Sequence, residues 1–102
     1  MKYVFDLDGT ILETAVRTYD VIEPNEDMIR TINNLYDKEN EIIIHTARHW
    51  NNLQRTIEQL RTHNVRYTTL VMGKPVADYY VDDKAMRPDE FVKLKMEDTD
   101  NE

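Results

Sequence analysis

The chain opens with the residues YVFDLDGT at positions 3–10. Their first part is aromatic and β-branched, which is typical of a β-strand, and Gly9 allows a sharp turn after it. A second apolar run, at residues 42–44, is isoleucine throughout and does not alternate with polar residues. Such continuous runs are typical of strands that a parallel sheet buries on both faces. We therefore predict a strand at each place.

The residues around the second run show the spacing of amphipathic helices. Within residues 28–36 the apolar side chains recur on one helical stripe, with Asn25 as a candidate N-cap and two acids in the first turn. Residues 67–72 and 79–81 are the remaining strand candidates. Strands that alternate with helices predict βαβ units, and hence an α/β fold with a parallel sheet. The second helical stripe comprises Trp50, Leu53, Ile57 and Leu60.

Composition limits the class of protein and its partners. The 102 residues carry 13 Lys and Arg against 20 Asp and Glu, a net charge of −7, and no Cys. We predict one domain over residues 1–95 and a disordered acidic tail over residues 96–102. The acidic balance argues against a nucleic-acid partner, and the lack of Cys excludes disulfides and thiol nucleophiles. Without a long apolar run or a signal-peptide pattern, we expect a cytoplasmic protein that binds no membrane.

Polar residues follow each predicted strand. Asp6 and Asp8 end the first, HTAR at residues 45–48 follows the second, GKP at residues 73–75 follows the 67–72 run, and an acidic pair occupies residues 82–83. Ligands of open α/β sheets bind beyond the carboxyl ends of the strands. We therefore expect four carboxylates, a hydroxyl group and an ammonium group to share one crevice.

These residue types together fit phosphoryl transfer. Carboxylates that ionise side by side repel one another and need a cation, and Mg²⁺ is suited because it binds carboxylate and phosphate oxygens. One carboxylate can attack phosphorus while a second moves the proton. Thr46 and the backbone N–H groups after it can hold phosphoryl oxygens, and Lys74 can neutralise their charge. Each piece alone also fits a turn, a helix cap or a solvated lysine, but their order along the strands favours catalysis.

The same stretches match the motifs of a known family. DLDGTI at residues 6–11, IIHT at residues 43–46, Lys74 and YVDD at residues 80–83 resemble the four motifs of the haloacid dehalogenase-like superfamily of phosphohydrolases. The resemblance extends over residues 1–95. It implies a three-layer α/β/α Rossmann-like fold with a parallel sheet.

The resemblance also implies a role for each motif residue. Asp6 would be the nucleophile and Asp8 the general acid/base. Magnesium would be held by the Asp6 carboxylate, the Asp8 backbone carbonyl and Asp82, with Asp83 in support. The residues that would bind the transferring phosphoryl group are Thr46, Ala47 and Lys74.

The chain departs from many members of the superfamily in two respects. Val81 precedes the acidic pair where a Gly is common, and Lys84 follows where a further acid is common, which leaves the role of Asp83 open. Residues 11–24 and 73–78 are too short for a cap domain, so we expect a capless protein. An uncapped site is open to water and to bulky substrates unless a second subunit of a homo-oligomer covers it.

A nearer likeness bears on the substrate. TAR at residues 46–48, GKP at residues 73–75 and DDKAMRP at residues 82–88, followed by EF at residues 90–91, resemble small phosphatases of capsule or polysaccharide biosynthesis. This likeness implies a small phosphorylated metabolite, a sugar or polyol phosphate, as substrate. Arg48 at the start of a helix could grip a second anionic group, although a surface ion pair is an equal alternative. The candidate specificity residues are Arg17, Tyr19, Arg48 and Arg87.

Three other functions share part of this pattern. A phospho-accepting receiver domain uses a similar acidic pocket, but there the adjacent acids open the chain, whereas here they come last. A non-catalytic relative that binds a ligand is opposed by the presence of all the motif residues. A polynucleotide end-phosphatase fits the chemistry but not the charge of −7.

Overall fold

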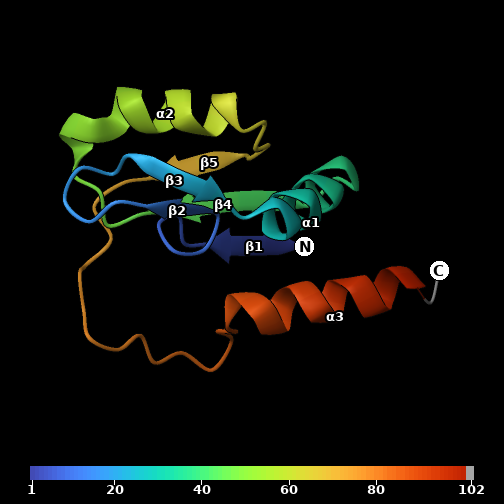
Figure 1. Ribbon diagram of the computed structural model, residues 1–102. Coiled ribbons are helices and arrows are strands. Elements are labelled where there is room, and N and C mark those ends of the chain that lie inside the picture. Colours follow the sequence, from blue (N-terminus) through green and yellow to red (C-terminus); the bar gives the residue numbers. More distant parts are fainter. Residues whose placement is uncertain (101–102) are drawn as a thin grey trace.

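The computed structural model describes residues 1–100, with side chains to residue 97 (Figure 1). A parallel sheet has the strand order β1-β4-β5, and a separate antiparallel hairpin pairs β2 with β3. The predicted α/β class with a parallel sheet is therefore confirmed. The elements are β1 (Lys2–Phe5), β2 (Leu12–Thr14), β3 (Val21–Pro24), α1 (Glu26–Asp37), β4 (Glu41–His45), the 3₁₀ helix η1 (Trp50–Asn52), α2 (Leu53–Thr62), β5 (Thr69–Val71) and α3 (Pro88–Asp100).

One face of the sheet forms the core. Phe5 pairs with Ile44 in the register of β1 and β4, and both side chains are buried together with apolar residues of α1 and α2. Val4 pairs with Ile43 and points to the opposite face, where it is 60% exposed. The parallel sheet with helices packed against it has the expected Rossmann-like α/β architecture.

Helix α1 follows the pattern that predicts it. The Asn25 side chain accepts a hydrogen bond of 3.2 Å from the Met28 backbone N–H, which satisfies a donor that the first turn would otherwise leave unpaired. Glu26 and Asp27 lie in the first turn, where the helix dipole stabilises acids. The buried side chains of the stripe are Met28, Ile29, Ile32 and Leu35.

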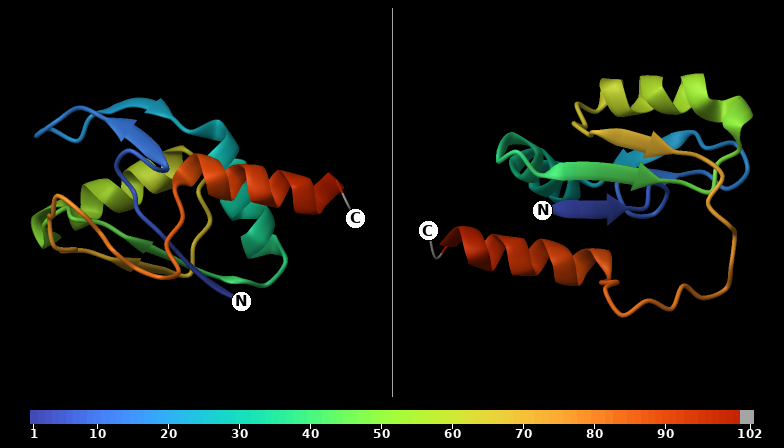
Figure 2. Two further views of the ribbon diagram at one scale, coloured as in Figure 1. Left: turned by 90° about the horizontal axis from the view of Figure 1, so that it is seen from below. Right: turned by 180° about the vertical axis from the view of Figure 1, so that it is seen from behind.

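Helix α3 closes the core beside β1 (Figures 1 and 2). The ring of Phe91 packs edge-on against Tyr3 and Phe5, with centroids 5.7 and 5.4 Å away. The helix continues to Asp100, so the disordered tail predicted from residue 96 is wrong for residues 96–100, which are helical. Residues 101–102 of that prediction lie outside the described residues.

The strand predicted at residues 79–81 is absent. Residues 73–87 contain neither strand nor helix and arc away from the sheet (Figure 1). Tyr79 and Val81 are 86% and 96% exposed, so this short run buries almost none of its apolar surface. A pattern of three apolar residues cannot show whether a neighbouring strand is available to pair with it. As a result, Asp82 and Asp83 do not follow a strand.

No helix in the described part of the chain combines the length and the apolar character needed to cross a bilayer.

Candidate active site

Three of the predicted site residues meet at the carboxyl ends of the strands. Asp6 directly follows β1 and Thr46 directly follows β4, while Lys74 lies just beyond β5. The Lys74 Nζ is 3.8 Å from the Asp6 Oδ1. The Lys74 backbone N–H donates to the Thr46 carbonyl at 2.8 Å, which ties the two loops together. The structure therefore brings a carboxylate, a hydroxyl group and an ammonium group to one sheet edge.

The loop that carries Lys74 is held from two sides. Gly73 has a φ of 80°, which favours glycine, and its N–H donates to the Arg48 carbonyl at 2.9 Å. The Lys74 ammonium lies 4.0 Å from the centroid of the Tyr80 ring, a cation–π contact. The Tyr80 hydroxyl in turn donates to the Pro75 carbonyl. These contacts direct the Lys74 side chain toward Asp6.

Burial is the main influence on the pKa of Asp6. It raises the pKa of Asp6 above the ordinary value, and the negative charge of Asp8 acts in the same direction. The Lys74 ammonium, the Leu7 backbone N–H and the His45 side chain oppose the rise in this pKa without cancelling it. A carboxylate in this position is less well solvated than one on the surface, and is therefore less stabilised before it reacts.

Asp6→Asn is expected to raise the melting temperature of the metal-free protein by a few degrees at pH 7. Because the folded-state pKa of Asp6 is raised, ionisation of this group destabilises the fold as pH increases from 3.8, the ordinary value, through the raised one. The gain should vanish below pH 3.8, where the carboxyl is protonated in both states. Thermal unfolding in buffer with a chelator measures it, with the exposed Asp89→Asn as control. An equal or lower melting temperature at pH 7 contradicts the prediction.

Asp8 is held by a buried arginine. The Arg48 side chain is fully buried and donates to Asp8 twice, from Nε to Oδ2 at 3.1 Å and from Nη2 to Oδ1 at 2.7 Å. The Thr14 hydroxyl from the hairpin also donates to the Asp8 Oδ1, at 2.8 Å. Asp8 retains 27% exposure. Sequence reasoning missed Thr14, because nothing in its surroundings marks it as a partner of Asp8.

The expectation that Arg48 grips a second anionic group of the substrate is corrected by this geometry. Its guanidinium is surrounded by Asp8 on one side and by Thr56 and Gln59 of α2 on the other, and none of it reaches solvent. The alternative prediction, a surface ion pair of Arg48, is also wrong, because the Arg48 side chain in the pair with Asp8 is fully buried. Sequence position alone could not identify an acid 40 residues earlier as the partner.

Thr46 and Ala47, the predicted phosphate-binding residues, follow β4 at the same edge of the sheet. Thr46 is fully buried, and its Oγ1 accepts from the Arg48 backbone N–H at 3.1 Å, an arrangement that also starts the turn toward α2. The Thr46 hydroxyl oxygen is therefore an acceptor in a local hydrogen bond. Ala47 between them is half-buried.

The remaining predicted residues are not part of this cluster. Asp82 and Asp83 lie on the exposed segment of residues 75–87, where the Lys84 backbone N–H donates to Asp82 at 2.9 Å and lowers the pKa of that carboxyl. Arg87 is 80% exposed and lies 3.9 Å from Asp89 in a surface pair of the kind that contributes little. Arg17 is exposed in the loop between β2 and β3.

The predicted magnesium ligands do not come together in this arrangement. Across the described side chains, no group of three or more Asp, Glu or His lies close enough to hold a metal ion. Asp6 offers a partly exposed carboxylate, and Arg48 engages the side chain of Asp8 rather than the backbone carbonyl that is the predicted ligand. Asp82 lies on a segment that arcs away from the sheet (Figure 1). The placement of these residues therefore does not fit a magnesium site.

Comparison with known proteins agrees with the fold and the motifs. Residues 3–97 match the model of the haloacid dehalogenase-like hydrolases. A crystal structure of a structural-genomics target from Vibrio cholerae is similar to this chain with a TM-score of 0.75 and 28% identity, over 98% of this chain and 94% of that one. A search of curated proteins returned no match.

Proposed function

Because the chain belongs to the haloacid dehalogenase-like hydrolases, we propose that it is a phosphatase that hydrolyses a small phosphomonoester through a phosphorylated Asp6. The observation that carries the proposal is the ion pair of Asp6 and Lys74, 3.8 Å apart at one edge of the sheet. A partly buried carboxylate beside a fixed ammonium is suited to attack a phosphoryl group whose charge the ammonium neutralises.

The proposed reaction has two steps. In the first, an Asp6 oxygen forms a bond to phosphorus while the bond to the leaving oxygen breaks; Asp8, which first takes up a proton from solvent at the acceptor position that Arg48 and Thr14 leave open, gives that proton to the leaving oxygen. In the second, Asp8 takes a proton from a water molecule, whose oxygen attacks phosphorus and releases phosphate and the Asp6 carboxylate. Lys74 neutralises the phosphoryl oxygens throughout, and the Thr46 hydroxyl, which is buried in this arrangement, would have to be uncovered to donate to one of them.

The substrate class rests on the nearer sequence likeness to phosphatases of capsule and polysaccharide biosynthesis. We propose a sugar or polyol phosphate in the cytoplasm, hydrolysed by a capless site that a second copy of the chain helps to cover. The absence of a cap domain in this proposal is supported by residues 11–24, whose only regular elements are the two strands of a hairpin. The net charge of −7 argues against a nucleic-acid substrate.

Magnesium dependence is also part of the proposal and is supported by the chemistry of the family. A bound divalent ion would offset the repulsion between the acids and the substrate phosphate. With the present placement of Asp82 and Asp83, such an ion would require the part of the chain that carries these two residues to move toward Asp6. No catalytic step described above is assigned to it.

A chromogenic aryl phosphate tests the function. The purified chain is expected to release phosphate in the presence of Mg²⁺ and to lose at least about nine-tenths of that rate after chelation, with recovery on readdition. Full activity in excess chelator would rule out magnesium dependence and leave the Asp6 mechanism standing. No turnover with any divalent ion would favour the non-catalytic alternative. A phosphorylated Asp6 that persists for minutes would favour the receiver-like one.

A further inference from the structure

The buried arginine beside the site has a geometry more specific than a charge pair requires. Arg48 uses one edge of its guanidinium for two hydrogen bonds to Asp8, with Nε donating to Oδ2 at 3.1 Å and Nη2 to Oδ1 at 2.7 Å. This two-point contact fixes the plane of the carboxylate as well as its position. A single-point contact with lysine would leave the carboxylate free to rotate.

The rest of the guanidinium is fixed by other elements. Its Nη1 donates to the Thr56 hydroxyl at 3.1 Å and to the Gln59 carbonyl oxygen at 2.6 Å, both on α2. The ring of Tyr19, from the hairpin loop, lies 4.7 Å from the guanidinium carbon. These contacts hold the arginine side chain in one conformation. Its contact with Asp8 therefore costs little further side-chain entropy.

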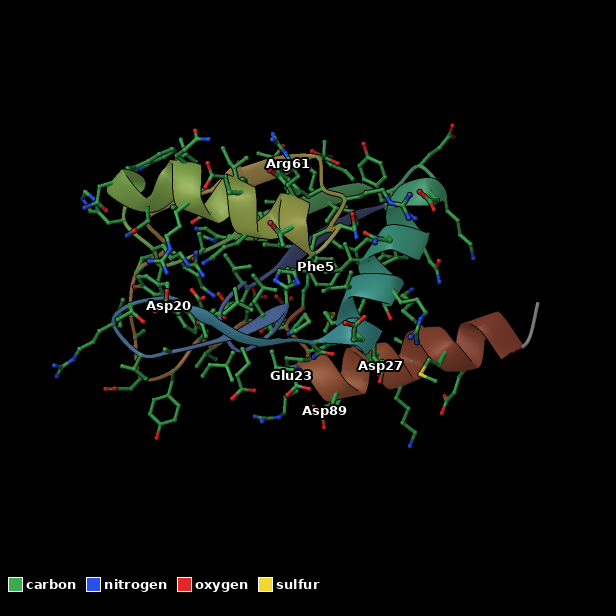
Figure 3. All side chains as sticks on the ribbon, turned by 45° about the horizontal axis from the view of Figure 1, so that its top comes forward. Phe5, Asp20, Glu23, Asp27, Arg61 and Asp89 are labelled. Carbon is green, nitrogen blue, oxygen red and sulfur yellow. The ribbon has the colours of Figure 1, made fainter. Side chains whose placement is uncertain are left out.

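The hairpin loop is tied to the same helix. The Gln59 side-chain amide donates to the Tyr19 carbonyl at 2.9 Å. Arg55 donates to the Thr18 carbonyl and pairs with Asp20, which Figure 3 places on this loop. The loop that covers Arg48 and the strand that carries Thr14 are thereby held in one position relative to α2.

These contacts leave one position open on Asp8. A carboxylate has about four acceptor positions, two on each oxygen. Two on Oδ1 are filled by Arg48 and Thr14, and one on Oδ2 is filled by Arg48. The open position is on Oδ2.

We propose that Arg48 is a positioning residue that, with Thr14, presents the Oδ2 of Asp8 as the atom that gives and takes the proton. This inference deepens the proposed phosphatase function and rests on it. Arg48 does not touch the substrate; it acts through Asp8. The consequence is a dependence on the leaving group, because proton donation matters when the leaving oxygen is a poor leaving group and matters little when it is a good one.

The variant Arg48→Lys keeps the charge and removes the two-point contact. In single-turnover experiments, its rate of alcohol release from glycerol phosphate is expected to fall about 10²-fold, whereas release of nitrophenol from p-nitrophenyl phosphate falls less than about fivefold. The KM for each substrate should be unchanged. Thr14→Val, which removes only the hydroxyl contact to Oδ1, should show a smaller loss with the same preference for the alkyl substrate.

The matched control is Arg66→Lys, since Arg66 forms a half-exposed pair with Asp37 at 3.3 Å and should change neither rate. Equal losses on the two substrates, or a loss confined to KM, would overturn the positioning role. If Arg48→Lys fails to fold by circular dichroism, Thr14→Val decides by the same ratio of rates. A parent protein that hydrolyses neither substrate overturns the proposed function and this inference together, whereas an active parent with no change in the ratio overturns this inference alone.

Discussion

Asp6→Asn is expected to lower the steady-state rate of phosphate release by at least about 10³-fold, with the chain still folded. The amide keeps the size and the planar shape of the carboxylate but cannot attack phosphorus. Lys74 would still lie at the sheet edge and could still attract the phosphate, so the loss should appear in kcat far more than in KM. Acid quenching followed by mass spectrometry should find a phosphoryl group on Asp6 of the parent and none on the variant.

The matched control for this experiment is Asp89→Asn, because Asp89 is 84% exposed in the first turn of α3. It should retain the parent rate. Retention of more than about a tenth of the activity by Asp6→Asn would exclude covalent catalysis by this residue. A phosphoryl group found on another side chain would assign the nucleophile elsewhere.

Asp8→Ala is expected to destabilise the fold by about 3 kcal/mol, since it leaves the buried guanidinium of Arg48 without its anionic partner. The estimate is at the low end for a broken buried pair because Asp8 is 27% exposed and water can enter its place. For a domain of this size, the melting temperature should fall by more than about 10 °C. Urea unfolding of parent and variant measures the difference.

A second substitution separates this cause from a general packing defect. Adding Arg48→Met to Asp8→Ala removes the unpaired charge and should recover part of the lost stability. Asp8→Asn, which keeps one acceptor for Arg48, should lose less than Asp8→Ala. A double variant no more stable than Asp8→Ala would show that the buried charge is not the cause. Asp6 and Asp8, two residues apart, are thus expected to affect stability in opposite directions.

The parts of the fold that depend on neighbouring residues could be predicted from the sequence. The strands at β1 and β4 follow from their aromatic and isoleucine runs, and α1 follows from its apolar stripe and the Asn25 cap. The second apolar stripe predicts α2 but starts too early, because Trp50 lies in the 3₁₀ helix before it and is 58% exposed. The convergence of Asp6, Thr46 and Lys74 was also predictable, since parallel strands place their carboxyl ends at one edge.

The α/β class and the carboxylate, hydroxyl and ammonium groups at the strand ends can therefore be read from the residues alone, because periodicity and strand direction are properties of short segments. The tertiary structure alone decided the partner of Arg48, the helix at the C-terminal end and the exposed course of residues 73–87. Each of these depends on which surfaces meet across many residues of chain. A buried guanidinium must find an acid wherever the fold supplies one, and a short apolar run becomes a strand only where a neighbour offers its backbone hydrogen bonds.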